Sequence, residues 1–583
     1  MTRRASNYDK RPFVHASSDE NECKKGWPEI GARLRAIGGA KPRVICIECY
    51  PGVFVDEITS ALARDLGPIT IMRAEYSLKS PVEIERITGA CLDNDDPVFG
   101  RLTSLGLSDF FDADKVLSVR SAIANAPGSV LVIGTGAAFV AAFYDVLIYA
   151  DLSRWEIQRR QRAGKISNWG ISNESESPAA KYKRSFFVDW RVADRWKQEL
   201  LGKLDFLLDT NDPQIPRMIS GDAFRAALAA AAQRPFRVVP YFDPGPWGGH
   251  WMEEVCDLPR DVPNHAWCFD CVPEENSLLL KFGSHVVEVP AIDLVFRHPR
   301  ELLGENVYSR FGAEFPIRFD FLDTMGGGNL SLQVHPAAQY IKEKFGMSYT
   351  QDESYYLLDA GDDASVFLGL KEEISPDEMT RDLHHAQSGN YPFPVEKYVN
   401  RWPAKKHDHF LIPAGTIHCS GRNSMVLEIS ATPYIFTFKL WDWNRPGLDG
   451  KPRPIHLDHG IANIDWNRTT NWVQRNLVDR IESLGSGPGW REERTGLHEL
   501  EFIETRRHWF TDKVPHDTSD GVNVLNLVQG DEASIESPDG AFEPSILHYA
   551  ETVIVPAAIG KFTIRPHGPS QNSECATIKA FVR

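Results

Sequence analysis

The chain has 583 residues and a mass of 65.6 kDa, enough for several domains with full hydrophobic cores. Its formal net charge of −16 argues against nucleic acid or an anionic membrane as the main partner. No run of about eighteen apolar residues predicts a membrane span, and the charged N-terminus lacks the apolar run of a signal peptide. Nine cysteines without regular spacing fit a reducing compartment, so we expect a cytoplasmic protein. Cys268 and Cys271 form a single Cys-x-x-Cys, which we interpret as free thiols rather than half of a zinc site.

Strand and helix patterns alternate from about residue 40 to residue 240. An apolar run at 44–48 is followed by a Pro-Gly turn and a helical pattern at 57–66. The Ala-rich stretch 224–233 has the pattern of the last helix of this layer. Such alternation predicts a largely parallel sheet with helices on both faces, and we assign residues 1–240 to this α/β domain. The further strand candidates are 69–74, 129–134 and 146–151.

The pattern changes from Phe242 onward to short strand candidates separated by Gly, Pro, Asn and Asp. Helical patterns occur mainly near 300–310 and 336–345. This pattern of short strands and turn residues is typical of all-β sandwiches or jelly rolls. A Pro-rich, polar segment at 376–405 has the character of an insertion between strands. We therefore predict one β-domain at 241–480 and a second, smaller one at 481–583, in which we find no clustered metal donors.

Four possible metal ligands follow one another in the first β-domain. In LSLQVHP (330–336), Gln333 and His335 are two residues apart, so on a strand their side chains share one face. Glu353 precedes an apolar strand pattern, and His418 follows a Pro-x-Gly turn. Each residue alone is more often an ordinary polar residue at a strand end. As an ordered set they predict a divalent-metal site with open coordination positions, as in a catalytic centre.

Several motifs in this half resemble, in order, those of the class I mannose-6-phosphate isomerases. They are PWGG (246–249), LSLQVHP (330–336), PAGTIH (413–418), VLEI (426–429), LWDWNR (440–445) and GKPRPIH (450–456). The resemblance implies paired cupin (jelly-roll) barrels and one zinc ion per chain, held by Gln333, His335, Glu353 and His418. It also implies interconversion of mannose 6-phosphate and fructose 6-phosphate, so that the partner is a small-molecule sugar phosphate.

The chain departs from this family pattern at two positions. Many relatives have a Lys two residues before the ligand Glu, where this chain has Gln351. A second family Lys is replaced by Asp320, although Arg318 is close in sequence. The metal-binding residues therefore match the family, whereas the residues expected to transfer the proton and bind the phosphate differ from it.

Basic residues after the metal motifs are the candidates for that second half. We assign catalytic roles to Arg445 and Lys439, and substrate-binding roles to Arg318, Gln351 and Arg453. The alternative is that the basic residues of this segment are surface charges. His409 either faces the pocket or is exposed.

The first 240 residues resemble a nucleoside-kinase-like P-loop domain in a degraded form. A working phosphate loop needs a Lys and a Ser/Thr, but the chain reads CYPGVFVD at 49–56, where Asp56 would repel phosphate. Arg159 and Arg160 resemble a kinase lid, although an arginine run on a helix is more often a solvated face. We expect no ATP turnover, and a role as scaffold, dimer face or ligand sensor.

Three hypotheses for function follow. The first is a metal-dependent isomerase of mannose 6-phosphate and fructose 6-phosphate. The second is a catalytically silent regulatory protein that binds a sugar or sugar phosphate and retains the cupin metal site. The third is an iron-dependent cupin oxygenase, which Gln333 disfavours because such sites usually have a His-x-His pair. The exact sugar, the oligomeric state and the proton-transfer residue stay open.

Overall fold

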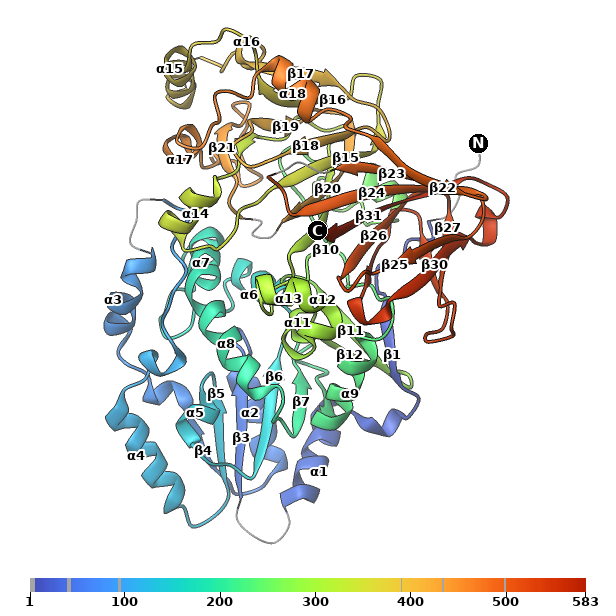
Figure 1. Cartoon of the computed structure of the whole chain (residues 1–583). Coiled ribbons are helices and arrows are strands. Elements are labelled where there is room, and N and C mark those ends of the chain that lie inside the picture. Colours follow the sequence, from blue (N-terminus) through green and yellow to red (C-terminus); the bar gives the residue numbers. More distant parts are fainter. Residues whose placement is uncertain (1–5, 39–42, 93–95, 390, 432–434, 497–499) are drawn as a thin grey trace. The chain divides into compact units, whose positions relative to one another are not determined.

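The computed structural model describes residues 6–38, 43–92, 96–389, 391–431, 435–496 and 500–583 (Figure 1). The chain separates into two compact units, each of which combines stretches that are distant in sequence. The α/β unit comprises Phe13–Ala231 and Pro273–His298. The β unit comprises Met1–Pro12, Ala232–Val272 and Pro299–Arg583. The predicted multidomain architecture, with many β-sheets and mixed α/β content, is confirmed at this level.

A seven-stranded sheet forms the centre of the α/β unit, in the order β2-β8-β7-β6-β3-β5-β4. The five strands from β7 to β4 are parallel, and at one edge β8 pairs antiparallel with both β7 and β2. The strands are β2 (Cys23–Lys25), β3 (Val44–Cys49), β4 (Thr70–Arg73), β5 (Val130–Gly134), β6 (Val146–Asp151), β7 (Phe206–Asp209) and β8 (Arg217–Ser220). The helices are α1 (Gly26–Gly38), α2 (Val55–Asp65), α3 (Pro81–Leu92), α4 (Ala113–Ala124), α5 (Ala137–Ala141), α6 (Arg154–Arg162), α7 (Pro178–Arg184), α8 (Trp190–Leu200) and α9 (Gly221–Ala231).

The central strands are apolar because they are covered on both faces. All residues of β3, β5 and β6 are buried, as expected for a parallel sheet between helices. The predicted alternation of strands and helices is therefore confirmed for this part of the chain. The predicted last helix at 224–233 corresponds to α9, which begins three residues earlier.

A later segment of the chain returns to the α/β unit, which the sequence pattern does not predict. Strands β11 (Ser277–Phe282) and β12 (His285–Pro290) form a small sheet with β1 (Phe13–Ser17), and α11 (Ile292–Arg297) follows them. Lys197 of α8 binds Asp151 at 2.6 Å and Asp293 of α11 at 2.5 Å. All three side chains are buried, so this ion triad ties the returning segment to the parallel sheet.

Two antiparallel sheets form the first sheet pair of the β unit. One has the order β18-β15-β20-β13-β10-β9, and the other has the order β17-β16-β19-β14-β21. The first consists of β9 (Tyr241–Asp243), β10 (Trp267–Cys271), β13 (Ile317–Asp323), β15 (Glu353–Ala360), β18 (His409–Ile412) and β20 (Ser424–Ala431). The second consists of β14 (Leu332–Val334), β16 (Ser365–Leu370), β17 (Val399–Pro403), β19 (His418–Ser420) and β21 (Phe438–Trp441).

Helices accompany this pair, some near the predicted ranges 300–310 and 336–345 and others outside them. They are α10 (Trp251–Val255), α12 (Pro299–Leu303), α13 (Glu305–Phe311), α14 (Ala338–Phe345), α17 (Leu457–Ile461) and α18 (Thr470–Asn476). The segment 376–405 lies between β16 and β18 and forms α15 (Pro376–Gln387), α16 (Val395–Tyr398) and β17. Its last part is therefore a strand of the five-stranded sheet rather than a loop.

The second sheet pair contains the C-terminal strands, drawn in red in Figure 1. A six-stranded sheet contains β22 (Glu482–Gly487), β23 (Trp490–Gly496), β24 (Ile503–Phe510), β31 (Cys575–Val582), β26 (Asn523–Gln529) and β29 (Thr552–Val555). A four-stranded sheet contains β25 (Val514–Asp517), β30 (Lys561–Pro566), β27 (Glu532–Glu536) and β28 (Ser545–His548). Buried residues from both sheets, such as Leu525 and Ile564, form one apolar core.

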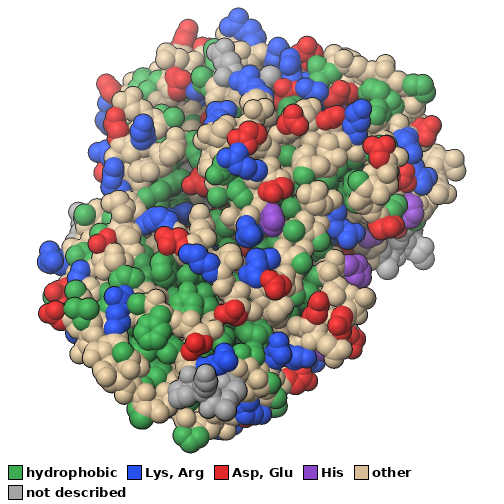
Figure 2. Space-filling model, turned by 60° about the horizontal axis from the view of Figure 1, so that its bottom comes forward, with side chains coloured by type: hydrophobic (Ala, Val, Ile, Leu, Met, Phe, Trp, Pro, Cys, Tyr) green, Lys and Arg blue, Asp and Glu red, His purple; other side chains and the backbone are tan. Residues whose placement is uncertain are grey.

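Three further features are the surface charges, the length of the helices and the state of the cysteines. On the face drawn in Figure 2, the described Lys and Arg side chains are interspersed with Asp and Glu. Among the described residues, no helix is long and apolar enough to cross a membrane. All nine cysteines, including Cys268 and Cys271, are free thiols.

Candidate metal centre

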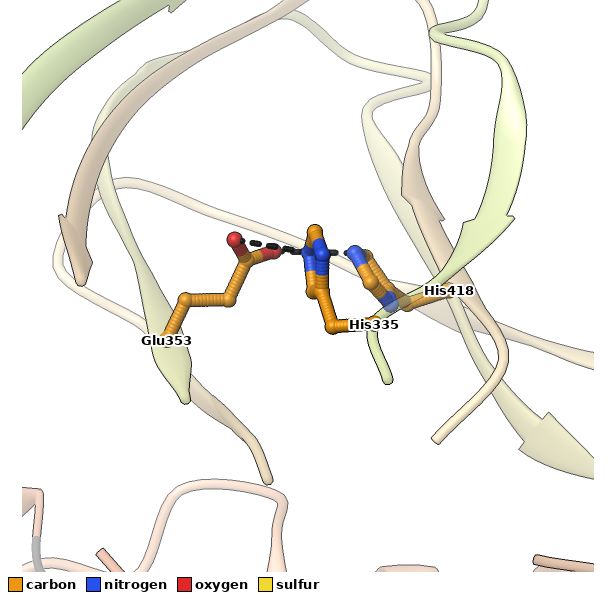
Figure 3. Close-up of side chains that lie close together, drawn as sticks. All are labelled: His335, Glu353 and His418. Atoms are coloured by element: carbon orange, nitrogen blue, oxygen red, sulfur yellow. Dashed lines mark ion pairs between the residues drawn. The ribbon is translucent and has the colours of Figure 1, made fainter. Parts of the chain in front are cut away.

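His335, Glu353 and His418 converge on one point between the two sheets of the first pair (Figure 3). His335 directly follows β14, Glu353 begins β15, and His418 begins β19. The Nε2 atom of His335 is 3.0 Å from Glu353 Oε2, and Nε2 of His418 is 2.8 Å from Glu353 Oε1. The three side chains are fully buried, so this cluster of donors lies inside the fold.

Both histidines are oriented by backbone carbonyls. The Nδ1 atom of His335 lies 3.0 Å from the carbonyl of Phe436, and Nδ1 of His418 lies 2.9 Å from that of Thr416. A carbonyl oxygen only accepts, so each Nδ1 donates a hydrogen bond to it, and Nε2 is the atom that would offer its lone pair to an ion at the centre. Metal-binding histidines typically donate a hydrogen bond from their other ring nitrogen in this way.

Gln333 belongs to the same cluster through strand pairing. It is the partner of His418 across β14 and β19, and its side-chain amide lies 3.2 Å from His418 Nε2. Rotation of the amide by 180° exchanges its oxygen and nitrogen, so Gln333 can offer an oxygen to the same point. The structure thus brings together the four residues that the sequence groups as metal ligands.

The electrostatics of the cluster fit a cation. Burial would raise the pKa of Glu353, but the two imidazoles beside it hold that pKa well below its usual range. Within the described part of the chain, His335 Nε2 and Glu353 Oε1 are buried without a hydrogen bond of good geometry. Two imidazoles, one carboxylate and one amide oxygen are ligands that zinc and similar divalent ions accept, so the residues present fit such an ion.

Gln351 lies beside the cluster and orients it. Its side-chain nitrogen donates a hydrogen bond of 3.0 Å to Oε2 of Glu353, and Gln351 is itself buried. Tyr355 lies two residues beyond Glu353 on β15, with its ring 5.7 Å from that of His418. The sequence analysis did not single out Tyr355, although the period of two along a strand places it on the face of Glu353.

Arg318 is buried in a network of carboxylates. Its guanidinium contacts Asp320 at 3.1 Å and Glu428 at 2.8 Å, and only 2% of the side chain is exposed. These partners favour a role in holding the interior of the sheet pair together. Direct contact of Arg318 with a substrate stays a prediction.

Lys439 is the partner of Gln333 across β14 and β21, so both side chains lie on the same face of the sheet. Burial and the neighbouring Arg453 together lower the pKa of Lys439 to about 7. Within the described residues, the Lys439 amine has no hydrogen-bond or ion-pair partner.

Arg445 and Arg453 are held by one carboxylate that the sequence analysis did not single out. Asp442 binds Arg445 at 2.5 Å and Arg453 at 2.6 Å, and it also accepts a hydrogen bond of 2.9 Å from Ser331. Ser331 precedes Gln333 by two residues, so the two arginines lie near the strand that carries the cluster. Two guanidinium groups against one carboxylate leave a net positive charge there.

His409 lies on the other face of β18. It pairs with Tyr356, the neighbour of Tyr355, and its ring packs at 5.6 Å against that of Tyr356. The side chain is fully buried, and burial lowers its pKa to about 3. Both sequence interpretations of His409, facing the pocket or exposed, are therefore wrong, because alternation along the strand turns it away from Glu353.

Comparison with known proteins gives one family model and several curated relatives, each for part of the chain. Residues 26–233 match a family model described as a domain of unknown function (DUF8485). A mannose-6-phosphate isomerase from Streptococcus mutans is 27% identical over 227 residues, covering 39% of this chain and 66% of that protein. The mannose-6-phosphate isomerase ManA of Bacillus subtilis is 24% identical over 232 residues, covering 40% of this chain and 68% of that protein.

Among solved structures, the mannose 6-phosphate isomerase from Bacillus subtilis superposes with a TM-score of 0.49 at 18% identity, covering 59% of this chain and 99% of that one. The chain spans about two thirds of the length of the curated relatives it matches. Over about 40% of its length, it is homologous to mannose-6-phosphate isomerases.

Proposed function

We propose that the β unit is a metal-dependent aldose–ketose isomerase that interconverts mannose 6-phosphate and fructose 6-phosphate. The observation that carries this proposal is the convergence of His335, Glu353, His418 and Gln333, with Lys439 opposite Gln333 on the same sheet face. The activity named for the curated relatives supports it. Zinc is the ion we expect, at one per chain.

The reaction moves a proton between the adjacent carbons C1 and C2 of an open-chain sugar. A bound divalent ion would act as a Lewis acid toward the oxygens on these carbons. Gln333, His335, Glu353 and His418 are the residues that would hold it. Gln351 contributes by fixing the orientation of the Glu353 carboxylate.

Lys439 is our candidate for proton transfer. A general acid or base works best when its pKa is near the working pH, and the pKa of Lys439 is about 7. Its amine can therefore accept a proton from one carbon and return it to the other at neutral pH. This role would replace one of the lysines that the family has at the positions of Asp320 and Gln351.

Arg453 and Arg445 are our candidates for the phosphate and for negative charge that develops on the sugar. Both are pre-oriented by Asp442, and guanidinium groups match phosphate oxygens with paired N–H donors. We also propose that the protein is cytoplasmic and that its two sheet pairs are cupin barrels.

A sugar-binding regulatory protein is the second candidate function. Asp320 and Gln351 favour it, because neither can take the part of a family lysine. In that case the chain would bind a sugar or sugar phosphate saturably and would not convert it.

We also propose that the α/β unit is a kinase-like domain that does not transfer phosphate from ATP. After β3, Arg160 donates hydrogen bonds to the carbonyls of Gly52 at 2.8 Å and Thr210 at 2.7 Å. Its guanidinium also lies 4.1 Å over the ring of Phe54. A protein cation and an aromatic ring therefore fill the turn where a phosphate loop would present amide groups. Phosphate release by the full chain with ATP and Mg²⁺ above a no-protein blank would contradict this.

The test of the isomerase is a coupled assay of metal-replete protein with mannose 6-phosphate. We expect turnover in the wild type and loss of turnover in the His335→Ala variant. A wild-type chain that binds the sugar phosphate without converting it would instead support the regulatory function.

A further inference from the structure

A second cavity lies on the outer face of the five-stranded sheet, away from the candidate metal centre. Phe367 of β16 is the partner of Cys419, whereas the next residue, Leu368, is the partner of His418. Because successive side chains point to opposite faces of a sheet, Phe367 points away from the face of His418. Arg401 of β17 pairs with Phe367 and shares that outer face. The sheet itself therefore separates this cavity from the metal ligands.

Aromatic side chains give the cavity an apolar surface. Its volume is 460 Å³, within the range of about 300–1,000 Å³ that is usual for small-molecule sites. Phe367, Phe393 and Trp443 line it, and the ring centroids of Phe367 and Trp443 are 5.7 Å apart. Phe367 and Phe393 are each only 4% exposed and form the floor, so the half-buried Trp443 offers the flat ring face against which the C–H groups of a ligand ring can pack.

The backbone at Trp443 is held in an unusual conformation. Trp443 and Asn444 both have left-handed backbones, with φ angles of 57° and 53°. A bulky residue adopts this region at a cost in free energy, and such outliers concentrate at functional sites. The indole nitrogen donates a hydrogen bond of 2.8 Å to the carbonyl of Leu330, which fixes the ring at the cavity.

Each cation around the cavity is paired with a carboxylate. Arg401, Arg422 and Lys397 line it together with Glu396 and Asn329, and Lys397 is paired with Glu378 at 2.7 Å. Arg422 is paired with Asp363 through Nε and Nη2, and Nη1 of Arg401 lies 3.7 Å from Glu396. The two arginine side chains are 60% and 42% exposed, so their remaining N–H groups are accessible. Since each cation has a carboxylate beside it, the lining favours an uncharged ligand that both donates and accepts hydrogen bonds.

We propose that this cavity is a second ligand site, and that it takes a neutral saccharide. A sugar ring combines C–H faces, one of which packs on Trp443, with hydroxyl groups that both donate and accept hydrogen bonds. Arginine N–H groups, the Glu396 carboxylate and the Asn329 amide supply the complementary partners. The proposal is independent of whether the metal centre is catalytic.

The test uses methyl α-D-mannopyranoside and methyl α-D-glucopyranoside as probes for the full chain. These glycosides are uncharged and locked as rings, so they are not substrates for an aldose–ketose isomerase. Binding is measured by ligand-observed NMR titration, with adenine as a non-saccharide comparison. The variants are Arg401→Ala/Arg422→Ala at the cavity, His335→Ala at the metal centre, and Arg491→Ala as a matched control. Arg491 is 48% exposed and is likewise paired with a carboxylate, Glu574.

We expect at least one glycoside to bind, with a Kd at least tenfold weaker in the Arg401/Arg422 double variant. The Kd should be unchanged in the His335 and Arg491 variants. If the His335 variant does not fold, wild-type chain saturated with mannose 6-phosphate takes its place, and glycoside binding should persist. Binding of adenine alone or no glycoside binding would overturn the proposal. Glycoside binding that survives the double variant, or that is lost when the metal centre is altered or filled, would also overturn it.

Discussion

At the scale of single residues, Gln351 holds the carboxylate of the predicted metal ligand Glu353 in position. It donates a hydrogen bond of 3.0 Å to Glu353 while both are buried. We expect Gln351→Ala to weaken metal binding by about 10–100-fold, the usual effect of losing an outer partner of a ligand. Zinc affinity measured by competition with a chelating dye checks this. The control is Gln339→Ala, which removes a similar amide–carboxylate bond on the surface of α14. An unchanged affinity in Gln351→Ala would show that Glu353 needs no such support.

Lys439 gives the second residue-scale prediction. Its lowered pKa means that the amine becomes neutral above about pH 7, so kcat/KM should rise as the pH passes through this value. Lys439→Met should reduce kcat by about 10²–10⁴-fold. Lys439→Arg should be similarly impaired, because a guanidinium keeps its charge and cannot accept a proton near neutral pH.

The control for Lys439 is Lys451→Met, which removes an exposed lysine of the same segment. Steady-state kinetics between pH 5.5 and about 9 with the coupled assay provide the measurement. A Lys439→Met enzyme with the wild-type rate and pH profile would exclude Lys439 from proton transfer.

At the scale of elements, the pairing of β23 with β24 gives a prediction for stability. Glu492 faces His508 across the two strands, and the His508 ring, with Arg506 beside it, lowers the pKa of Glu492 from 4.5 to about 2. A carboxyl group with a lowered pKa stabilises the fold above its ordinary pKa, and this contribution is lost as the pH falls toward 2. Glu492→Gln should therefore lower Tm at pH 7, and the difference should narrow below pH 4.5.

Thermal unfolding at several pH values tests this, with Glu574→Gln as the control. Glu574 pairs with Arg491 on the surface, where such a pair contributes little. A Tm difference for Glu492→Gln that stays constant from pH 7 to pH 3 would contradict the assignment.

Local pattern explains what the sequence could predict of these elements. The parallel strands are continuous apolar runs, and Gln333 and His335 share a face because a strand repeats every two residues. The approach of His418 depends on the pairing of β14 with β19 across 85 residues, which no local pattern contains. The family resemblance supplied that grouping. Arg318 illustrates the limit, because Asp320 is its neighbour on the same strand, whereas Glu428 reaches it only through the pairing of β13 with β20.

At the scale of the whole molecule, neither unit is a continuous stretch of chain. The return of Pro273–His298 to the α/β unit depends on the parallel pairing of β1 with β11 and on the Lys197 triad. Lys197→Met should leave Asp151 and Asp293 buried without their cation, at a cost of about 3–5 kcal/mol. Urea unfolding of the full chain measures this, with Lys203→Met as an exposed control. Equal unfolding midpoints for the two variants would show that the triad does not hold the segment.

The central claim is that one metal ion per chain, at His335, Glu353 and His418, makes the β unit an isomerase. The most direct measurement is to remove metal from the full chain with a chelator and to titrate zinc back, recording bound zinc and mannose 6-phosphate turnover together. We predict that activity rises in proportion to bound zinc and reaches its maximum at one ion per chain, and that His335→Ala neither binds the ion nor turns over. Full occupancy at one zinc per chain without any turnover would contradict the account.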